Sequence, residues 1–386
     1  MDTTREWASF SRRSLLVGAV GLALRARAAA AVDVAAVLQV NDLDRRIWFE
    51  ELDAFVPARM WDMHAHIGLY KFDHDPQRET ARRYALAAGQ LKKEATLATL
   101  RTCDEILYPG RMVMRFILPT PYQYCDCKEI NAWAAEETRN APDAVATMVV
   151  QPGMSAEYLD EQVRQHRFVG FKPYMWHAKV PNWYEARITD FLPEHQIEVG
   201  NHYGLVMALH LARRGGGGDP DNLADLERLS RRYPKVRWLL LHNARCYFDR
   251  PMERAAPRLR QMPNVWIEGS TVCEADALFA TFTQCGTEQF CYGSDDFYAG
   301  VSRGKYISWG EAWTQFDDSN FTQKLQHCDD RKTFVRYEML RALKRAAKYA
   351  GLKSGQVEDI FFGNGARLVE AVKSDLNRVL GQSNRS

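Results

Sequence analysis

The feature that most constrains the fold is a regular alternation of apolar runs and helical patterns in the middle of the chain. The runs are rich in β-branched, apolar and aromatic residues, as strands are. They are residues 59–67, 111–119, 144–151, 168–175, 204–212, 236–244, 264–271 and 289–296. Helical periodicity fills most of the gaps, as in residues 128–140, 155–166, 222–233, 253–262 and 275–284. Eight strand–helix units in a chain of 386 residues predict an α/β fold, a single-domain (β/α)8 TIM barrel.

Helical patterns also flank this alternation. Residues 33–56 read as one amphipathic helix that stops at Pro57, and residues 329–350 and 354–373 read as two C-terminal helices. The stretch RRGGGGDPDN (213–222) is predicted to be a βα loop, because strand and helix patterns resume on either side of it. Its four glycines indicate mobility or close approach to a ligand. The predicted organisation is a signal segment (1–31), an N-terminal helical segment (32–56), the barrel (57–375) and a flexible tail (376–386).

The first 31 residues have the pattern of an export signal. Arg12 and Arg13 precede the uncharged run SLLVGAVGLAL, and small residues in an A-x-A pattern follow. The run is too short to cross a bilayer, which needs roughly 20 residues. The paired arginines favour a twin-arginine signal, and hence a bacterial protein exported already folded to the periplasm or beyond, with the export machinery as a partner. The alternatives are an ordinary secretory signal or a disordered tail that carries arginines.

Charge and cysteine usage exclude several classes of protein. Without residues 1–31 the chain carries 46 basic and 47 acidic side chains, so no basic field remains to attract nucleic acid. The eight cysteines are scattered singly, apart from Cys125 and Cys127, and those inside apolar runs are expected to be reduced core thiols. No CxxC pair is present, which argues against a cysteine-type zinc site.

Ligand-type residues stand at the ends of several predicted strands, where a barrel of this kind has its active site. His64 and His66, in WDMHAHIG, are two residues apart, so on a strand they point to the same face. The other residues of this kind are Lys172, His210, His242 and Asp295. Taken singly, the histidines could be hydrogen-bonded core residues, Lys172 an ion-paired lysine, and Asp295 a cap. Six of them converging on one barrel mouth satisfy one another most simply through a metal ion.

This order of residues along the strands resembles the amidohydrolase superfamily. The single-domain barrel and the closing GNGARLV (363–369) are similar to its amidohydrolase-2 branch, which includes enzymes of the aminocarboxymuconate-semialdehyde decarboxylase type. The resemblance implies that His64, His66, His210 and Asp295 bind a divalent metal, with zinc expected, and that His242 polarises the bound water or substrate. One ion is favoured. If Lys172 is carboxylated, it would bridge two ions, and His210 and His242 would hold the second.

The implied chemistry is hydrolysis of an amide, ester or lactone by a metal-activated water. Asp295 would act as general acid and base, His242 would stabilise the oxyanion, and Lys172 completes the expected catalytic set. The same frame also performs non-oxidative decarboxylation, so a lyase is the alternative. A barrel that binds ligands without catalysis is a third possibility, and the intact set of ligands argues against it.

The residues expected to bind substrate follow the strand ends. Arg213, Arg245 and Arg303, with Lys305, could clamp a carboxylate or phosphate, although each could equally be a solvated surface charge. Aromatic residues could wall a pocket for a ring, or simply pack within the loops: Tyr174, Trp176, Trp309 and Trp313. His177 offers a further polar contact. These residues predict a small anionic substrate with a ring, and such a barrel is also compatible with a homo-oligomer.

Overall fold

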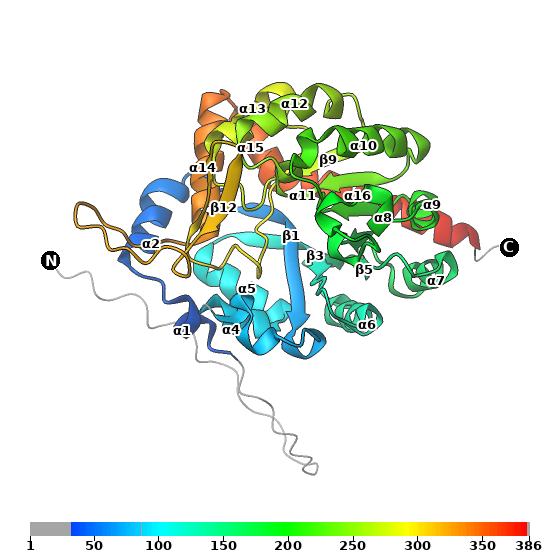
Figure 1. Ribbon diagram of the computed structural model, residues 1–386, viewed down its shortest axis with the longest axis horizontal. Coiled ribbons are helices and arrows are strands. Elements are labelled where there is room, and N and C mark those ends of the chain that lie inside the picture. Colours follow the sequence, from blue (N-terminus) through cyan, green and yellow to red (C-terminus); the bar gives the residue numbers. More distant parts are fainter. Residues whose placement is uncertain (1–31, 86, 384–386) are drawn as a thin grey trace, which may run out of the picture. The chain divides into compact units, whose positions relative to one another are not determined.

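The predicted strands run parallel and follow one another in chain order, in a sheet of two parts that divide at residue 147. The computed structural model describes residues 32–85 and 87–383 (Figure 1), so the predicted signal segment lies outside the described residues. The strands are β1 (Arg59–Leu69), β3 (Met112–Pro119), β4 (Ala144–Ala146), β5 (Met148–Val150), β6 (Gly170–Pro173), β7 (Val206–Leu209), β8 (Arg237–Leu240), β9 (Val265–Glu268) and β10 (Phe290–Cys291). Seven of the eight predicted runs contain their strands, with β4 and β5 sharing one run, and β1 extends two residues beyond the first run.

Backbone hydrogen bonds join the two parts of this sheet into a barrel. Between β4 and β5, the Thr147 amide donates to the Ile117 carbonyl of β3 at 2.9 Å. At the other edge, the Met63 amide of β1 donates to the Tyr292 carbonyl at 3.0 Å, so the chain beyond β10 adjoins the first strand. The predicted (β/α)8 fold is confirmed.

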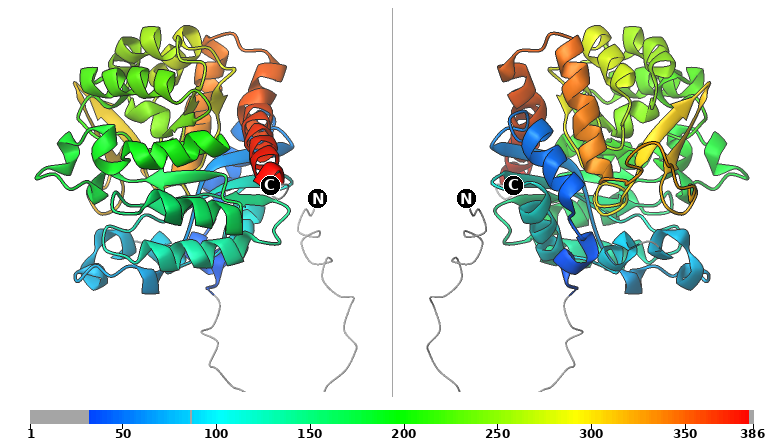
Figure 2. Two further views of the ribbon diagram at one scale, coloured as in Figure 1. Left: turned by 90° about the vertical axis from the view of Figure 1, so that its right-hand side faces the viewer. Right: turned by 90° about the vertical axis from the view of Figure 1, so that its left-hand side faces the viewer.

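Helices lie outside the strands in all views (Figures 1 and 2). The long ones after the first strand are α5 (Leu97–Leu107), α6 (Cys127–Thr138), α7 (Ala156–His166), α9 (Glu194–Tyr203), α10 (Pro220–Arg232), α12 (Asp249–Leu259), α13 (Ala275–Gln284) and α14 (Val335–Tyr349). Their starts follow from capping residues: Asp126 accepts from the Lys128 and Glu129 amides at α6, and Asp219 caps α10 with Pro220 in its first turn. Short helices α3 (Arg82–Ala85), α4 (Ala88–Lys93) and α8 (Ile188–Phe191) and strand β2 (Glu94–Ala95) complete the loops near the barrel mouth.

The predicted single helix over residues 33–56 is wrong in detail. It is divided into α1 (Val34–Leu38), α2 (Asp42–Arg46) and the π-helix η1 (Ile47–Leu52). Gln39 ends α1 in a left-handed conformation (φ 46°), and Asn41 then starts α2 through a capping box with Asp44. Figure 2 shows this segment (blue) beside helix α14 (orange).

The predicted flexible tail is largely helical. After α15 (Ser354–Glu358) and η7 (Asp359–Gly363), helix α16 runs from Asn364 to Ser383. Leu376 and Val379 are buried, which explains why the helix continues beyond residue 375. Within the described residues, no helix is both long and apolar enough to cross a membrane.

Two loops differ from their expected form. The loop after the eighth strand contains an antiparallel hairpin, β11 (Lys305–Trp309) with β12 (Ala312–Phe316), that was not predicted. Within the glycine-rich loop, Gly216 to Gly218 form a buried 3-10 turn, η6. A Cβ added at Gly216 would lie 2.7 Å from the Arg245 carbonyl oxygen, so close packing against the chain's own backbone requires glycine there.

Candidate metal centre

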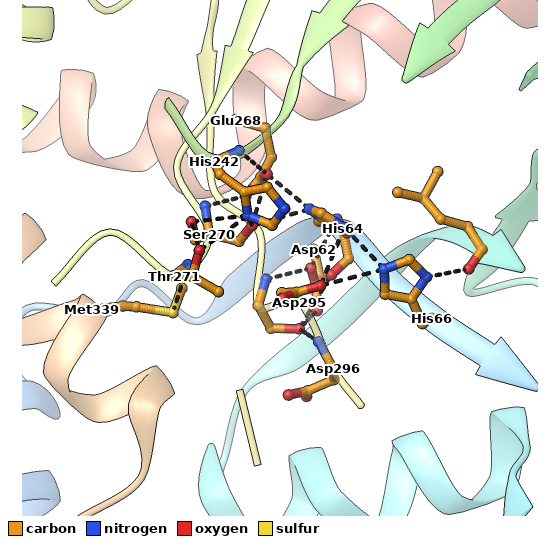
Figure 3. A network of polar contacts seen from close by, with 12 residues as sticks. Asp62, His64, His66, His242, Glu268, Ser270, Thr271, Asp295, Asp296 and Met339 are labelled. Atoms are coloured by element: carbon orange, nitrogen blue, oxygen red, sulfur yellow. Dashed lines mark hydrogen bonds and ion pairs between the residues drawn. The ribbon is translucent and has the colours of Figure 1, made fainter. Parts of the chain in front are cut away.

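Two histidines of β1 and one aspartate after β10 bring three ligand atoms together. The Nε2 atoms of His64 and His66 lie 3.1 Å apart, and Asp295 Oδ1 lies 3.3 Å from each (Figure 3). All three side chains are buried. Ligands about 2.1 Å from a common ion would be roughly 3.0–3.5 Å from one another, so the spacing fits a bound cation.

The second ring nitrogens fix the tautomers of both histidines. His66 Nδ1 donates to the Leu118 carbonyl at 2.8 Å, and His64 Nδ1 donates to Glu268 Oε2 at 2.9 Å. With Nδ1 as the donor, the Nε2 lone pair of each ring faces the other ring and a carboxylate oxygen. Three acceptors that face one another in a buried site are unsatisfied without a cation, and this outer hydrogen bonding is typical of metal-bound histidine.

Glu268 is a site residue that the sequence analysis missed. It ends β9, is fully buried, and accepts from the Ser270 hydroxyl at 2.9 Å and the His242 amide at 3.3 Å, as well as from His64. Burial raises the pKa of its carboxyl group to about 7. The stretch NVWIEGST (264–271) contains the sign of it, because Glu268 is an acidic residue late in an apolar strand. The resemblance to the amidohydrolase superfamily implied no site residue on this seventh strand.

His242 lies beside this group in a strained turn. Residues 242–245 all adopt left-handed backbone conformations, with φ of 54–58°, and such strain concentrates at functional sites. Its Nδ1 lies 3.0 Å from the hydroxyls of both Ser270 and Thr271, and its ring centroid is 4.9 Å from that of His64. Burial lowers its pKa to about 3, so the ring is neutral.

Asp295 is held by the backbone of the first strand. Its amide donates to the His64 carbonyl at 2.8 Å, and its φ of 58° is left-handed. Asp62, also buried, accepts from the His64 and Ser294 amides at 3.0 and 2.9 Å and so fixes both neighbours of the site. Burial opposes ionisation of Asp295, but the imidazoles of His64, His66 and His242 outweigh it and lower its pKa.

Lys172 and His210 border the group without joining it. Lys172 is the last residue but one of β6, and its Nζ is buried with no hydrogen-bond partner among the described residues. Burial lowers its pKa to about 7. His210 directly follows β7, and its ring centroid is 5.0 Å from that of His242. Each candidate ligand group here contains three residues: His64, His66 and Asp295, or His64, His242 and Glu268. His210, the fourth expected ligand, is in neither.

Aromatic side chains and one arginine surround the site. Tyr174 stacks near His210 at 4.8 Å and near Trp176 at 3.9 Å, which places both predicted aromatics at the mouth. Trp313 of the hairpin lies 3.8 Å from Tyr247, whereas Trp309 is exposed. Arg245 donates to the Leu211 carbonyl at 2.7 Å, and its Nε is buried with no partner in the described part of the chain.

Three residues expected to bind substrate are engaged elsewhere. Arg303 donates to the buried Asp44 at 2.8 Å and to the Leu38 carbonyl at 3.0 Å, so it holds the N-terminal segment and does not face the mouth. Arg213 is paired with Asp219 at 2.8 Å and with Asp221 at 2.7 Å. His177 lies with Cys125 and Cys127 in a separate group. The sequence identified these side chains but could not give their direction.

The comparisons with known proteins agree with this geometry. A family model described as amidohydrolase, the amidohydrolase-2 model, matches residues 61–370. No curated protein sequence matches the chain significantly.

Solved structures resemble the chain over most of their length. The 5-carboxyvanillate decarboxylase from Sphingomonas paucimobilis has 11% identity and a TM-score of 0.53, with 81% of this chain and 99% of that chain covered. A dihydroxybenzoic acid decarboxylase from Polaromonas sp. JS666, solved with manganese and an inhibitor, has 12% identity and a TM-score of 0.52, covering 81% and 97%. A probable 2-pyrone-4,6-dicarboxylic acid hydrolase from Acinetobacter baumannii has 16% identity and a TM-score of 0.50, covering 81% and 99%. At these identities the likeness shows a shared fold. The family model matches the part of the chain that carries the site, and this chain therefore belongs to the amidohydrolase family of enzymes.

Proposed function

We propose that the protein is a metal-dependent hydrolase that cleaves a C–N or C–O bond in a small carboxylated substrate with a ring. The observation that supports this most directly is the convergence of His64 Nε2, His66 Nε2 and Asp295 Oδ1 on one buried point. Two imidazoles and one carboxylate form a donor set that suits a single zinc ion and leaves a coordination position open. A bound divalent ion would lower the pKa of a water towards ~7 and polarise a carbonyl group.

The protein's own groups supply the proton transfers. Asp295 lies next to both Nε2 atoms, where its carboxylate can accept a proton from the attacking water and return it to the leaving group. His242 is neutral and oriented by the Ser270 and Thr271 hydroxyls, so its Nε2 is left for the substrate oxygen or the water. Glu268 keeps the His64 proton on Nδ1 and thereby keeps Nε2 free for the ion.

The surroundings favour a carboxylated ring as substrate. Arg245 is the predicted cation that still has an unused buried donor, Nε, and its guanidinium lies 5.8 Å from the ring of Trp313. Tyr174, Tyr247 and Tyr298 offer flat faces around the histidines, with Tyr298 5.3 Å from His66.

Non-oxidative decarboxylation is the second candidate. Two of the solved structures with this fold are decarboxylases of carboxylated phenols, and their substrates have the features that the arginine and tyrosines here would recognise. A decarboxylase would use the same centre to bind the substrate, and Asp295 could protonate the carbon that loses CO2 only after taking up a proton from a hydroxyl group of the substrate.

One experiment separates the two. The zinc-loaded protein is incubated with aryl esters, amides, lactones and hydroxybenzoates in ¹⁸O-labelled water, and the products are analysed by mass spectrometry. An organic product that contains ¹⁸O, formed without release of CO2, supports a hydrolase. Release of CO2 together with an unlabelled organic product supports a decarboxylase. Asp295→Asn should abolish either activity. If the variant turns over any substrate as fast as the wild type, the proposed role of Asp295 is wrong.

We also propose that residues 1–31 direct export by the twin-arginine route, on the basis of Arg12, Arg13 and the uncharged run after them. In a bacterial host, Arg12→Lys with Arg13→Lys should retain the precursor in the cytoplasm. Normal export of that double variant would contradict the twin-arginine assignment.

A further inference from the structure

A second group of ligand-type side chains lies outside the barrel centre. Cys125, Cys127 and His177 each offer one ligand atom within 4.8 Å of the other two. The two Sγ atoms are 3.1 Å apart. Cys125 lies at the end of the loop between β3 and α6, Cys127 is the first residue of α6, and His177 belongs to the 3-10 turn η4 (Met175–His177) that follows β6. Two loops far apart in the sequence thus meet through sulfur and nitrogen atoms.

The two cysteines are held in place by the start of helix α6 and by a backbone carbonyl. Cys127 is the first residue of α6, and Asp126 caps that helix. Cys125 is half-buried, and its thiol donates to the Tyr122 carbonyl oxygen at 3.1 Å.

His177 has the hydrogen bonding of a metal-bound histidine. Its Nε2 donates to the Tyr122 carbonyl at 3.0 Å, and its Nδ1 is buried without a partner among the described residues. In the neutral ring Nδ1 is therefore an unsatisfied acceptor, which is costly unless a cation or donor meets it. His66 in the barrel centre shows the same arrangement, with one nitrogen on a backbone carbonyl and the other left for a ligand.

We propose that Cys125, Cys127 and His177 bind a thiophilic divalent cation, with Zn²⁺ the best fit, at a site separate from the barrel centre. Two thiolates and one imidazole suit zinc in a tetrahedral site, and because Cys125 and His177 are only half-buried, solvent can supply the fourth ligand. Binding would release the two thiol protons. The sequence analysis considered only a CxxC pair, whereas the proposed site combines a CxC pair with a histidine 50 residues later along the chain.

A disulfide between the two cysteines is the competing state. From their spacing of 3.1 Å, the sulfurs would have to approach to about 2.05 Å in a disulfide and to separate to about 3.8 Å around a zinc ion. A disulfide would leave the His177 nitrogen unsatisfied, and a zinc ion would not. A cation accounts for all three side chains.

Such a site would fasten two loops at the barrel mouth. Tyr122, whose carbonyl contacts both Cys125 and His177, also lines a small cavity with His66 and Tyr298. Tyr174 and Trp176 immediately precede His177 in the other loop. The cation would hold these walls in place without touching the substrate, and it would stabilise the fold by closing a long loop.

Cobalt titration tests the site directly, because cobalt bound to thiolate has an intense ultraviolet charge-transfer band and the barrel centre contains no cysteine. The full chain is reduced and stripped of metal under argon, and Co²⁺ is then added. We expect the band in the wild type and in His64→Ala with His66→Ala, and its loss in Cys125→Ser with Cys127→Ser. The matched control, Cys328→Ser, removes an exposed cysteine and should keep the band.

Zinc content gives a second readout. The Cys125→Ser, Cys127→Ser protein should hold about one equivalent less than the wild type, and His177→Gln should bind the second equivalent more weakly. A reduced wild type with no thiolate–cobalt band, or a double variant with the same zinc content as the wild type, would overturn the proposal. Because the spectrum depends on cysteine alone, either result leaves the proposed hydrolase function untouched.

Discussion

Glu268→Gln tests the orientation of the metal centre. The carboxylate accepts from His64 Nδ1, from the Ser270 hydroxyl and from two backbone amides, those of His242 and Ser270. A carboxamide keeps the shape but replaces one acceptor oxygen with a donor. If the new NH2 group faces His64, that ring must shift its proton to Nε2, which removes the lone pair meant for the ion. If it faces the Ser270 amide, two donors oppose each other.

Either conflict costs about 1–3 kcal/mol, since it leaves a buried donor unpaired. We therefore expect the metal affinity to fall about 10- to 100-fold, as for other residues that orient a ligand histidine. Competition with a fluorescent zinc chelator measures the dissociation constant, and near-ultraviolet circular dichroism confirms the fold. Glu370→Gln, at an exposed pair on α16, is the matched control. An unchanged dissociation constant in the folded Glu268→Gln protein would refute the role assigned to this carboxylate.

Other perturbations separate the remaining roles. His66→Ala should leave the purified protein without stoichiometric metal in the barrel centre while the circular dichroism spectrum is retained; full metal content would remove His66 from the ligand set. Arg303→Ala should lower the free energy of unfolding, measured by urea titration, by about 3–5 kcal/mol, because the buried Asp44 loses its ion-pair partner. The kcat/KM of the folded protein should not change; unchanged stability with a lowered kcat/KM would show that Arg303 binds substrate. Chelation should abolish activity and lower Tm, and an excess of 100-fold over Kd of added Zn²⁺ should return about 2.7 kcal/mol of stability; a Tm indifferent to chelator would argue against a bound ion. Arg245→Gln should raise KM for carboxylated substrates by roughly tenfold or more and spare analogues without a carboxylate; equal effects on both would show a structural role.

The architecture could be predicted from the sequence because it depends on pattern. Strands buried on both faces read as continuous apolar runs, so β7 and β8 were located within a few residues. The hairpin β11–β12 was missed because an eighth loop rich in aromatics resembles a binding loop. The two-residue turn at Gly310 and Glu311, between alternating residues, was its signal. The break at Gln39 depends on a left-handed residue, which hydrophobic periodicity does not reveal.

The site was predictable where it depends on strand ends, and not where it depends on side-chain direction. His64, His66 and Asp295 meet because parallel strands end at one face of the barrel. Arg303 turns towards Asp44, which is far away in the sequence, and Arg213 turns towards Asp219 across a tight turn. Residue type alone does not specify such pairs. His177 illustrates the same limit, since its partners come from another loop.

The hydrogen bond from the Asp295 amide to the His64 carbonyl has a consequence for biogenesis. The candidate ligands stand on the two sides of the junction between the first strand and the last, about 230 residues apart in the chain. A growing polypeptide would have no complete coordination sphere until nearly all of the chain had been synthesised. The segment after the last strand would also have to pair with the first strand. Acquisition of the ion would then be one of the latest steps in maturation, and only a chain that had finished folding could retain it.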